Sequence, residues 1–172
     1  MKKIRIIAAV IFTAFCMGCT MNTKEGTSLL EEGKFSEAIA CFEKDIAEEK
    51  HLEEAYRGVA IAYFQLGEYQ EALSNFQTLL EMEKVEETPS LHAMMAVCYL
   101  QLEKYEESLA SYQKALELEC TEEMKQEILF NEIAIYQELG NWDVVKEKVA
   151  AYVELYPDDT RMDKTVEFLE TR

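Results

Sequence analysis

The chain has 172 residues, of which 34 are acidic and 17 basic, and its formal net charge is −17. Affinity for DNA and RNA comes mainly from Lys and Arg contacts to phosphates, so this charge argues against a nucleic-acid partner. Hydrophobic residues form 49% of the chain, which disfavours disorder, and the presence of only 6 Gly and 2 Pro disfavours a turn-rich all-β fold. The length suggests a single domain.

The amino-terminal segment combines a basic start with a short apolar run. Lys2, Lys3 and Arg5 precede a ten-residue apolar run, 6–15, that carries no charge. This run is too short to span a bilayer as a helix, which needs about 20 residues, but it is typical of an export signal. We therefore expect residues 1–18 to form a signal peptide. This segment is also compatible with an ordinary secretory signal or with an uncleaved membrane anchor.

The end of this segment carries a second motif, Cys16-Met17-Gly18-Cys19. It resembles the cleavage site of a bacterial lipoprotein, in which a small residue precedes the lipidated Cys. The resemblance implies cleavage before Cys19, lipid on its thiol, and a membrane-anchored protein on the extracytoplasmic side of the bacterial cell envelope. Cys16 departs from the usual pattern, which has Leu at that position. Residues 19–24 would form the tether between the lipid and the folded domain.

A pattern of a turn, an aromatic residue and a small or branched residue occurs four times along the chain. The small or branched residues are Ala38, Ala72, Ser108 and Val145, which lie 34, 36 and 37 residues apart. Each segment follows another stretch with helical spacing of apolar residues, as in residues 56–63. Each unit therefore is predicted to be a helix, a tight turn and a second helix.

Local signals support these predicted helices. Thr88 before Pro89 suits a helix N-cap followed by a first-turn proline, and Thr121 before two glutamates suits another helix start. The first unit has only Asn22, Gly26 and Leu29 where larger core residues are expected, so we expect its opening helix to fray near the lipid. In the fourth unit Trp142 and Val145 predict shifted packing.

The repeated pattern resembles the tetratricopeptide repeat (TPR) family, most closely in residues 89–120. The resemblance implies an all-α fold, an α-solenoid of about four TPR helix-turn-helix repeats with a C-terminal capping helix. It places the TPR domain at 25–157, with repeats at about 20–52, 53–86, 89–121 and 122–157, and the capping helix at 158–172. We expect Met162, Val166 and Leu169 to lie on one side of that helix and to cover the last apolar face.

In TPR domains the first helix of each pair lines a concave groove that binds a protein or peptide partner. The groove positions that the resemblance transfers to this chain are Arg57, Ile61, Phe64, Ala93, Val97, Leu100, Gln101, Phe130, Ala134 and Gln137. We also expect Leu30 to contribute from the first repeat. This set is mostly apolar and lacks the Lys and Asn residues that some TPR domains use to hold a C-terminal carboxylate. The alternative is that Phe64, Leu100 and Phe130 only pack between neighbouring helices.

The sequence gives no indication of catalysis. His51 and His92 are far apart, and no hydrolase, zinc-protease or P-loop motif is present. Cys41, Cys98 and Cys120 form no C-x-x-C motif, and the fold and the residues predict no cofactor and no metal. We therefore expect a non-enzymatic, membrane-anchored adaptor. The alternatives are an envelope assembly factor or pilotin-like chaperone, an acidic-rim metal-binding or hydrolytic protein, and a self-associating structural protein.

Overall fold

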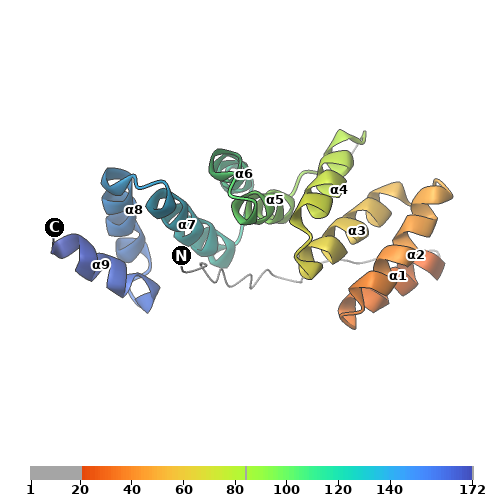
Figure 1. Cartoon of the computed structure of the whole chain (residues 1–172), viewed down its shortest axis with the longest axis horizontal. Coiled ribbons are helices and arrows are strands. Elements are labelled where there is room, and N and C mark those ends of the chain that lie inside the picture. Colours follow the sequence, from red (N-terminus) through yellow and green to blue (C-terminus); the bar gives the residue numbers. More distant parts are fainter. Residues whose placement is uncertain (1–20, 84, 172) are drawn as a thin grey trace.

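The computed structural model describes residues 21–83 and 85–171, all of whose regular elements are helices. The predicted signal peptide and Cys19 lie outside the described residues. The helices follow one another along an elongated, arched row with the two ends of the row far apart (Figure 1). They are α1 (Met21–Glu31), α2 (Phe35–Ala47), α3 (Leu52–Leu66), α4 (Tyr69–Glu81), α5 (Pro89–Gln101), α6 (Tyr105–Glu117), α7 (Glu122–Glu138), α8 (Trp142–Leu155), the 3₁₀ turn η1 (Thr160–Met162) and α9 (Asp163–Glu170).

Four antiparallel helix pairs, α1–α2 to α7–α8, form the repeats, and their registers match the predicted pattern. The four small or branched residues that define the repeat, Ala38, Ala72, Ser108 and Val145, all have exposed fractions of 0%. The Ser108 hydroxyl donates a 2.8 Å hydrogen bond to the Ala96 carbonyl, which satisfies this polar group inside the α5–α6 pair. The all-α repeat fold predicted from the sequence is therefore confirmed.

The predicted helix starts are also confirmed. The Thr88 hydroxyl accepts a hydrogen bond from the Leu91 backbone N–H at 3.3 Å, with Pro89 as the first helical residue. The Thr121 hydroxyl accepts from the Met124 N–H at 3.2 Å in the same way. Each threonine satisfies one of the backbone donors that a helix start leaves free.

The tight turns inside the repeats require a left-handed backbone. Gly33, Gly67 and Gly140 have φ angles of +73°, +79° and +68°, a conformation that glycine adopts without steric cost. The third repeat has Glu103 at the same place, with φ +59°. Residues other than glycine rarely adopt this backbone conformation, so the third turn stores local strain.

The first repeat is packed more closely than the sequence suggested. Gly26 of α1 and Gly58 of α3 lie on the ring of Phe42, and a Cβ added at Gly26 would come within 2.8 Å of that ring. The Thr23 hydroxyl, 1% exposed, donates a 2.9 Å hydrogen bond to the fully buried Asp45 carboxylate of α2. The small residues of α1 thus permit close helix packing, and α1 is packed against α2 and α3 where we expected it to fray. The helix begins at Met21, so residues 21–24, assigned above to the tether, are helical.

The carboxy-terminal segment covers the end of the row. Met162 is 4% exposed, and Val166 and Leu169 pack with it on the cluster formed by α7 and α8. This is the face that the sequence predicted. In the fourth repeat Val145 is buried in the same cluster, while the Trp142 ring remains 39% exposed and lies 5.0 Å from the Phe168 ring of α9.

Candidate functional site

The predicted groove positions differ widely in exposure. Five of them are buried, namely Phe64, Ala93, Val97, Leu100 and Ala134, with exposed fractions of 5–8%. The first four belong to the hydrophobic core that α3 to α7 share, so they contribute to packing. Arg57, Ile61, Phe130 and Gln137 are partly exposed, and Gln101 is exposed. The accessible part of the predicted groove is therefore smaller than the sequence pattern implied.

Arg57, the single cation among the groove positions, is already paired. Its guanidinium lies 3.0 Å from the Glu53 carboxylate one helical turn earlier, and its side chain is 19% exposed. The paired group retains donors but adds little net positive charge to the concave face.

In the fourth repeat, the carboxy-terminal segment contacts two predicted groove residues. The Gln137 side-chain amide donates a 3.1 Å hydrogen bond to the Thr165 hydroxyl of α9. The Arg161 guanidinium lies over the Phe130 ring, 4.3 Å from its centroid. At this end the chain's own terminal segment therefore occupies part of the surface that Phe130 and Gln137 offer.

A polar network fixes this terminal segment to α7 and α8. The Asp159 carboxylate accepts hydrogen bonds from the Tyr152 hydroxyl, from Gln126 at 2.7 Å and from Arg161 at 2.6 Å. Arg161 also pairs with Glu127 at 2.7 Å. The Arg161 guanidinium holds the pKa of Asp159 well below its usual value. Burial raises the pKa of Tyr152 to about 12, and the hydrogen bond to Asp159 contributes as a smaller cause. The ionised Asp159 thus stabilises the docked segment.

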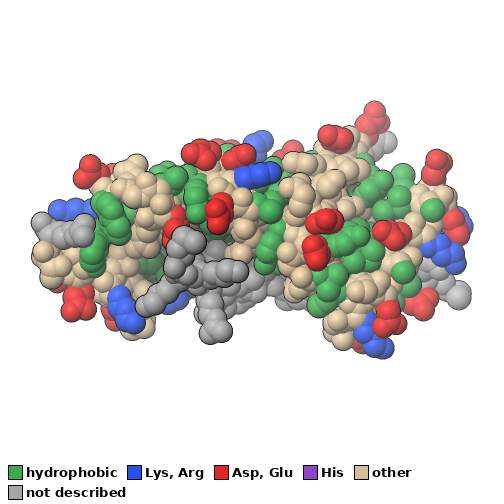
Figure 2. Space-filling model, viewed as in Figure 1, with side chains coloured by type: hydrophobic (Ala, Val, Ile, Leu, Met, Phe, Trp, Pro, Cys, Tyr) green, Lys and Arg blue, Asp and Glu red, His purple; other side chains and the backbone are tan. Residues whose placement is uncertain are grey.

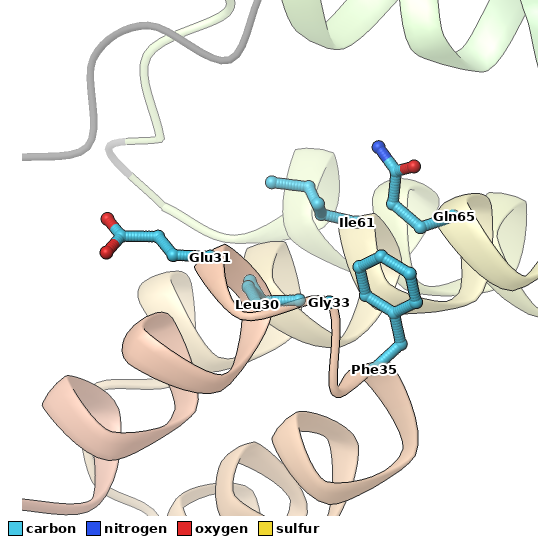
Figure 3. Close-up of a pocket in the computed structure, with 6 residues that line it drawn as sticks. All are labelled: Leu30, Glu31, Gly33, Phe35, Ile61 and Gln65. Atoms are coloured by element: carbon cyan, nitrogen blue, oxygen red, sulfur yellow. The ribbon is translucent and has the colours of Figure 1, made fainter.

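A cavity of about 430 Å³ lies between the first two repeats (Figure 3). We call it the N-terminal cavity, and it is lined by Leu30, Glu31, Gly33, Phe35, Ile61 and Gln65. Leu30 and Glu31 come from the end of α1, Gly33 from the following turn, Phe35 from the start of α2, and Ile61 and Gln65 from adjacent turns of α3. The cavity is open to solvent, and its volume falls within the range of known ligand pockets.

The N-terminal cavity includes one predicted groove residue, Ile61, and the expected contributor Leu30. Sequence reasoning missed Gln65, although it lies four residues after Ile61 and therefore on the same helix face. It also missed Glu31 and Phe35, whose contribution depends on how the α1–α2 turn places them. In the space-filling view, hydrophobic side chains gather over this amino-terminal part of the molecule, with acidic side chains around them (Figure 2).

The histidines and Cys98 lie in surroundings that do not resemble a catalytic or metal site. His92 is 5% exposed and hydrogen-bonds Glu87 at 2.7 Å, while His51 lies in the turn before α3. Burial raises the pKa of the Cys98 thiol to about 12, which disfavours the reactive thiolate. Among residues 21–83 and 85–171, no group of three or more His, Cys, Asp or Glu side chains is placed to hold a metal ion. Within the same ranges, no helix has the length and apolar character needed to cross a membrane.

The family model of the tetratricopeptide repeat matches residues 23–82 and 58–121, which together span more than half of the chain. The chain belongs to the TPR family. As a TPR protein it is a repeat scaffold for protein–protein interaction, of a kind that is typically non-enzymatic, and TPR proteins bind protein or peptide partners. A search of curated proteins gave no match.

Several solved structures are similar to this TPR chain. YrrB, described as "a TPR protein with an unusual peptide-binding site", has 24% identity and a TM-score of 0.66, over 79% of this chain and 68% of YrrB. MamA from AMB-1 has 17% identity and a TM-score of 0.69, over 86% of this chain and 78% of MamA. PilF from Pseudomonas aeruginosa has 14% identity and a TM-score of 0.64, over 85% of this chain and 64% of PilF. At these identities the similarity establishes the shared fold alone.

Proposed function

We propose that this TPR chain is a lipid-anchored, extracytoplasmic adaptor of the bacterial cell envelope, and that it binds a segment of a partner protein in the N-terminal cavity. The observation that carries the binding site is the cavity itself, which combines the groove residue Ile61 with accessible apolar and polar groups of the first repeat. The anchor is supported by the motif that ends at Cys19.

The short connection between anchor and fold has a mechanical consequence for an adaptor. With α1 beginning at Met21, only Thr20 separates Cys19 from the first helix. One extended residue spans about 3.3–3.6 Å, so a lipid on Cys19 would hold the first repeat, and with it the N-terminal cavity, close to the membrane surface. Confinement of both partners to one surface raises their effective concentration, so a modest intrinsic affinity would suffice.

Replacement of the lipidation site tests the anchor. In cells, Cys19→Ser should remove metabolic fatty-acid labelling and move the protein from the membrane fraction to the soluble fraction, whereas Cys41→Ser should change neither. Cys41 is a suitable control because it is a free, partly exposed thiol on α2. A Cys19→Ser protein that remains in the membrane fraction would favour an uncleaved anchor over a lipoprotein.

A further inference from the structure

We infer that the N-terminal cavity selects a partner segment in which an apolar side chain is flanked by Lys or Arg. This inference rests on the proposed adaptor function and specifies the chemistry of its partner. It assigns the apolar side chain to the surface of Leu30, Phe35 and Ile61, and the flanking cation to Glu31.

The cavity wall can hold an apolar side chain in a fixed place. Leu30 is 8% exposed and anchored in the first core cluster, against which Phe35 and Ile61 pack while remaining partly exposed. In the close-up view, Ile61 and Gln65 project beside one another above Leu30 and Phe35, and the Glu31 side chain extends outward on the Leu30 side (Figure 3). Burial of an apolar side chain on this surface is favourable by about 25 cal/mol per Å² of area removed from water. The Gln65 amide, which is exposed, adds one donor group and one acceptor for a peptide backbone.

The charge around the cavity favours a cation beside that apolar side chain. Glu31 is exposed at the cavity rim, and in the described part of the chain no basic side chain pairs with it. Two nearby cations are engaged elsewhere, Lys34 with Glu32 at 2.7 Å and Arg57 with Glu53 at 3.0 Å.

The wider surroundings have the same sign. Residues 23–82, which form the first two repeats, contain thirteen acidic and five basic side chains. An acidic segment would therefore meet unbalanced like charge, whereas a basic segment would pair with Glu31 and be attracted over a longer range.

A random 12-residue peptide library displayed on phage provides the probe. The full chain, purified in zwitterionic detergent micelles, is compared with Glu31→Lys and with Glu43→Lys. Glu43 is an exposed glutamate of α2 that does not line the cavity, so the control makes the same change of charge. Thermal unfolding followed by circular dichroism checks that both variants are folded.

The wild type should enrich peptides in which Lys or Arg neighbours Leu, Ile, Met or Phe. An exposed ion pair is worth about 0.2–1 kcal/mol, so Glu31→Lys should lower the preference for basic over acidic neighbours by up to about fivefold or reverse it. Glu43→Lys should retain the preference. Ile61→Ala should weaken enrichment of the apolar residue without changing the preferred charge.

Three results would overturn the inference: no enrichment by the wild type, enrichment of acidic neighbours, or a preference that Glu31→Lys leaves unchanged. In-cell photocrosslinking from Gln65 separates this failure from failure of the adaptor function. A discrete adduct with another protein, combined with a library that shows no basic preference, would retain the adaptor and reject the inference. An adduct of two copies of this chain would identify a second copy as the occupant and reject the inference as well. Absence of any adduct would reject binding at the N-terminal cavity, and with it the adaptor function as proposed.

Discussion

Gly58 provides a prediction in which two physical effects have opposite signs. Helix propensity alone says that Gly58→Ala, in the middle of α3, should stabilise the protein by about 1 kcal/mol. The structure says the reverse, because an added Cβ would lie inside van der Waals contact with the ring of Phe42. That ring is 1% exposed, and a Cβ added at Gly26 of α1 would meet it as well, so helices on more than one side restrict its movement. Overpacking of this kind costs about 1–3 kcal/mol, so after the propensity gain we expect a net loss of up to about 2 kcal/mol.

A double-mutant cycle in urea denaturation, followed by circular dichroism, measures this effect. Phe42→Leu alone should destabilise the protein because it leaves a void, and Gly58→Ala should become neutral or stabilising in the Phe42→Leu background. The two changes should therefore show a coupling energy of about 1–3 kcal/mol. A Gly58→Ala protein that is more stable than the wild type would refute the close packing of α1, α2 and α3 described here.

Two further predictions concern other parts of the row. Glu103→Gly should raise the free energy of unfolding by about 0.5–1 kcal/mol, because glycine removes the strain of a positive φ; a loss of stability in urea denaturation would count against a strained turn. Asp159→Asn should lower it by about 1–3 kcal/mol at neutral pH, because the ionised carboxylate accepts bonds from Tyr152, Gln126 and Arg161. Since the folded state depresses the pKa of Asp159, its contribution is present above the usual value of 3.8 and is lost as pH falls below it, so wild type and Asp159→Asn should converge in acid. An equal difference between them at neutral and at acid pH would contradict this assignment.

The parts of the fold that depend on local sequence were predictable. The N-caps at Thr88 and Thr121 and the turns after the first helix of each pair are encoded within a few residues, and the structure has them where they were expected. The register of the repeats was also predictable, because one buried small or branched residue recurs in every pair. At Glu103 the same left-handed turn forms without glycine.

The remaining features depend on contacts between residues distant in sequence. The expected fraying of α1 was inferred from its small residues, but these residues are small because α1 approaches Phe42 closely. The hydrogen bond from Thr23 to Asp45 and the Asp159 network join segments that no periodicity relates. The sequence could not show whether Phe64 and Leu100 are buried or line an open groove. Groove and core positions of a repeat helix carry the same apolar residue types, and the structure buries both side chains.

The most direct test of the adaptor proposal is photocrosslinking in cells from the N-terminal cavity. A photoreactive amino acid is placed at Gln65, which is exposed and lines the cavity, and at Glu106 of α6, which is exposed outside it, as the control. The proposal predicts a discrete adduct with another envelope protein from Gln65 and none from Glu106, with loss of the adduct in Cys19→Ser. A ladder of many adducts would favour a chaperone-like holder of exported chains. No adduct from Gln65, or equal adducts from both positions, would contradict the assignment of the cavity as the binding site.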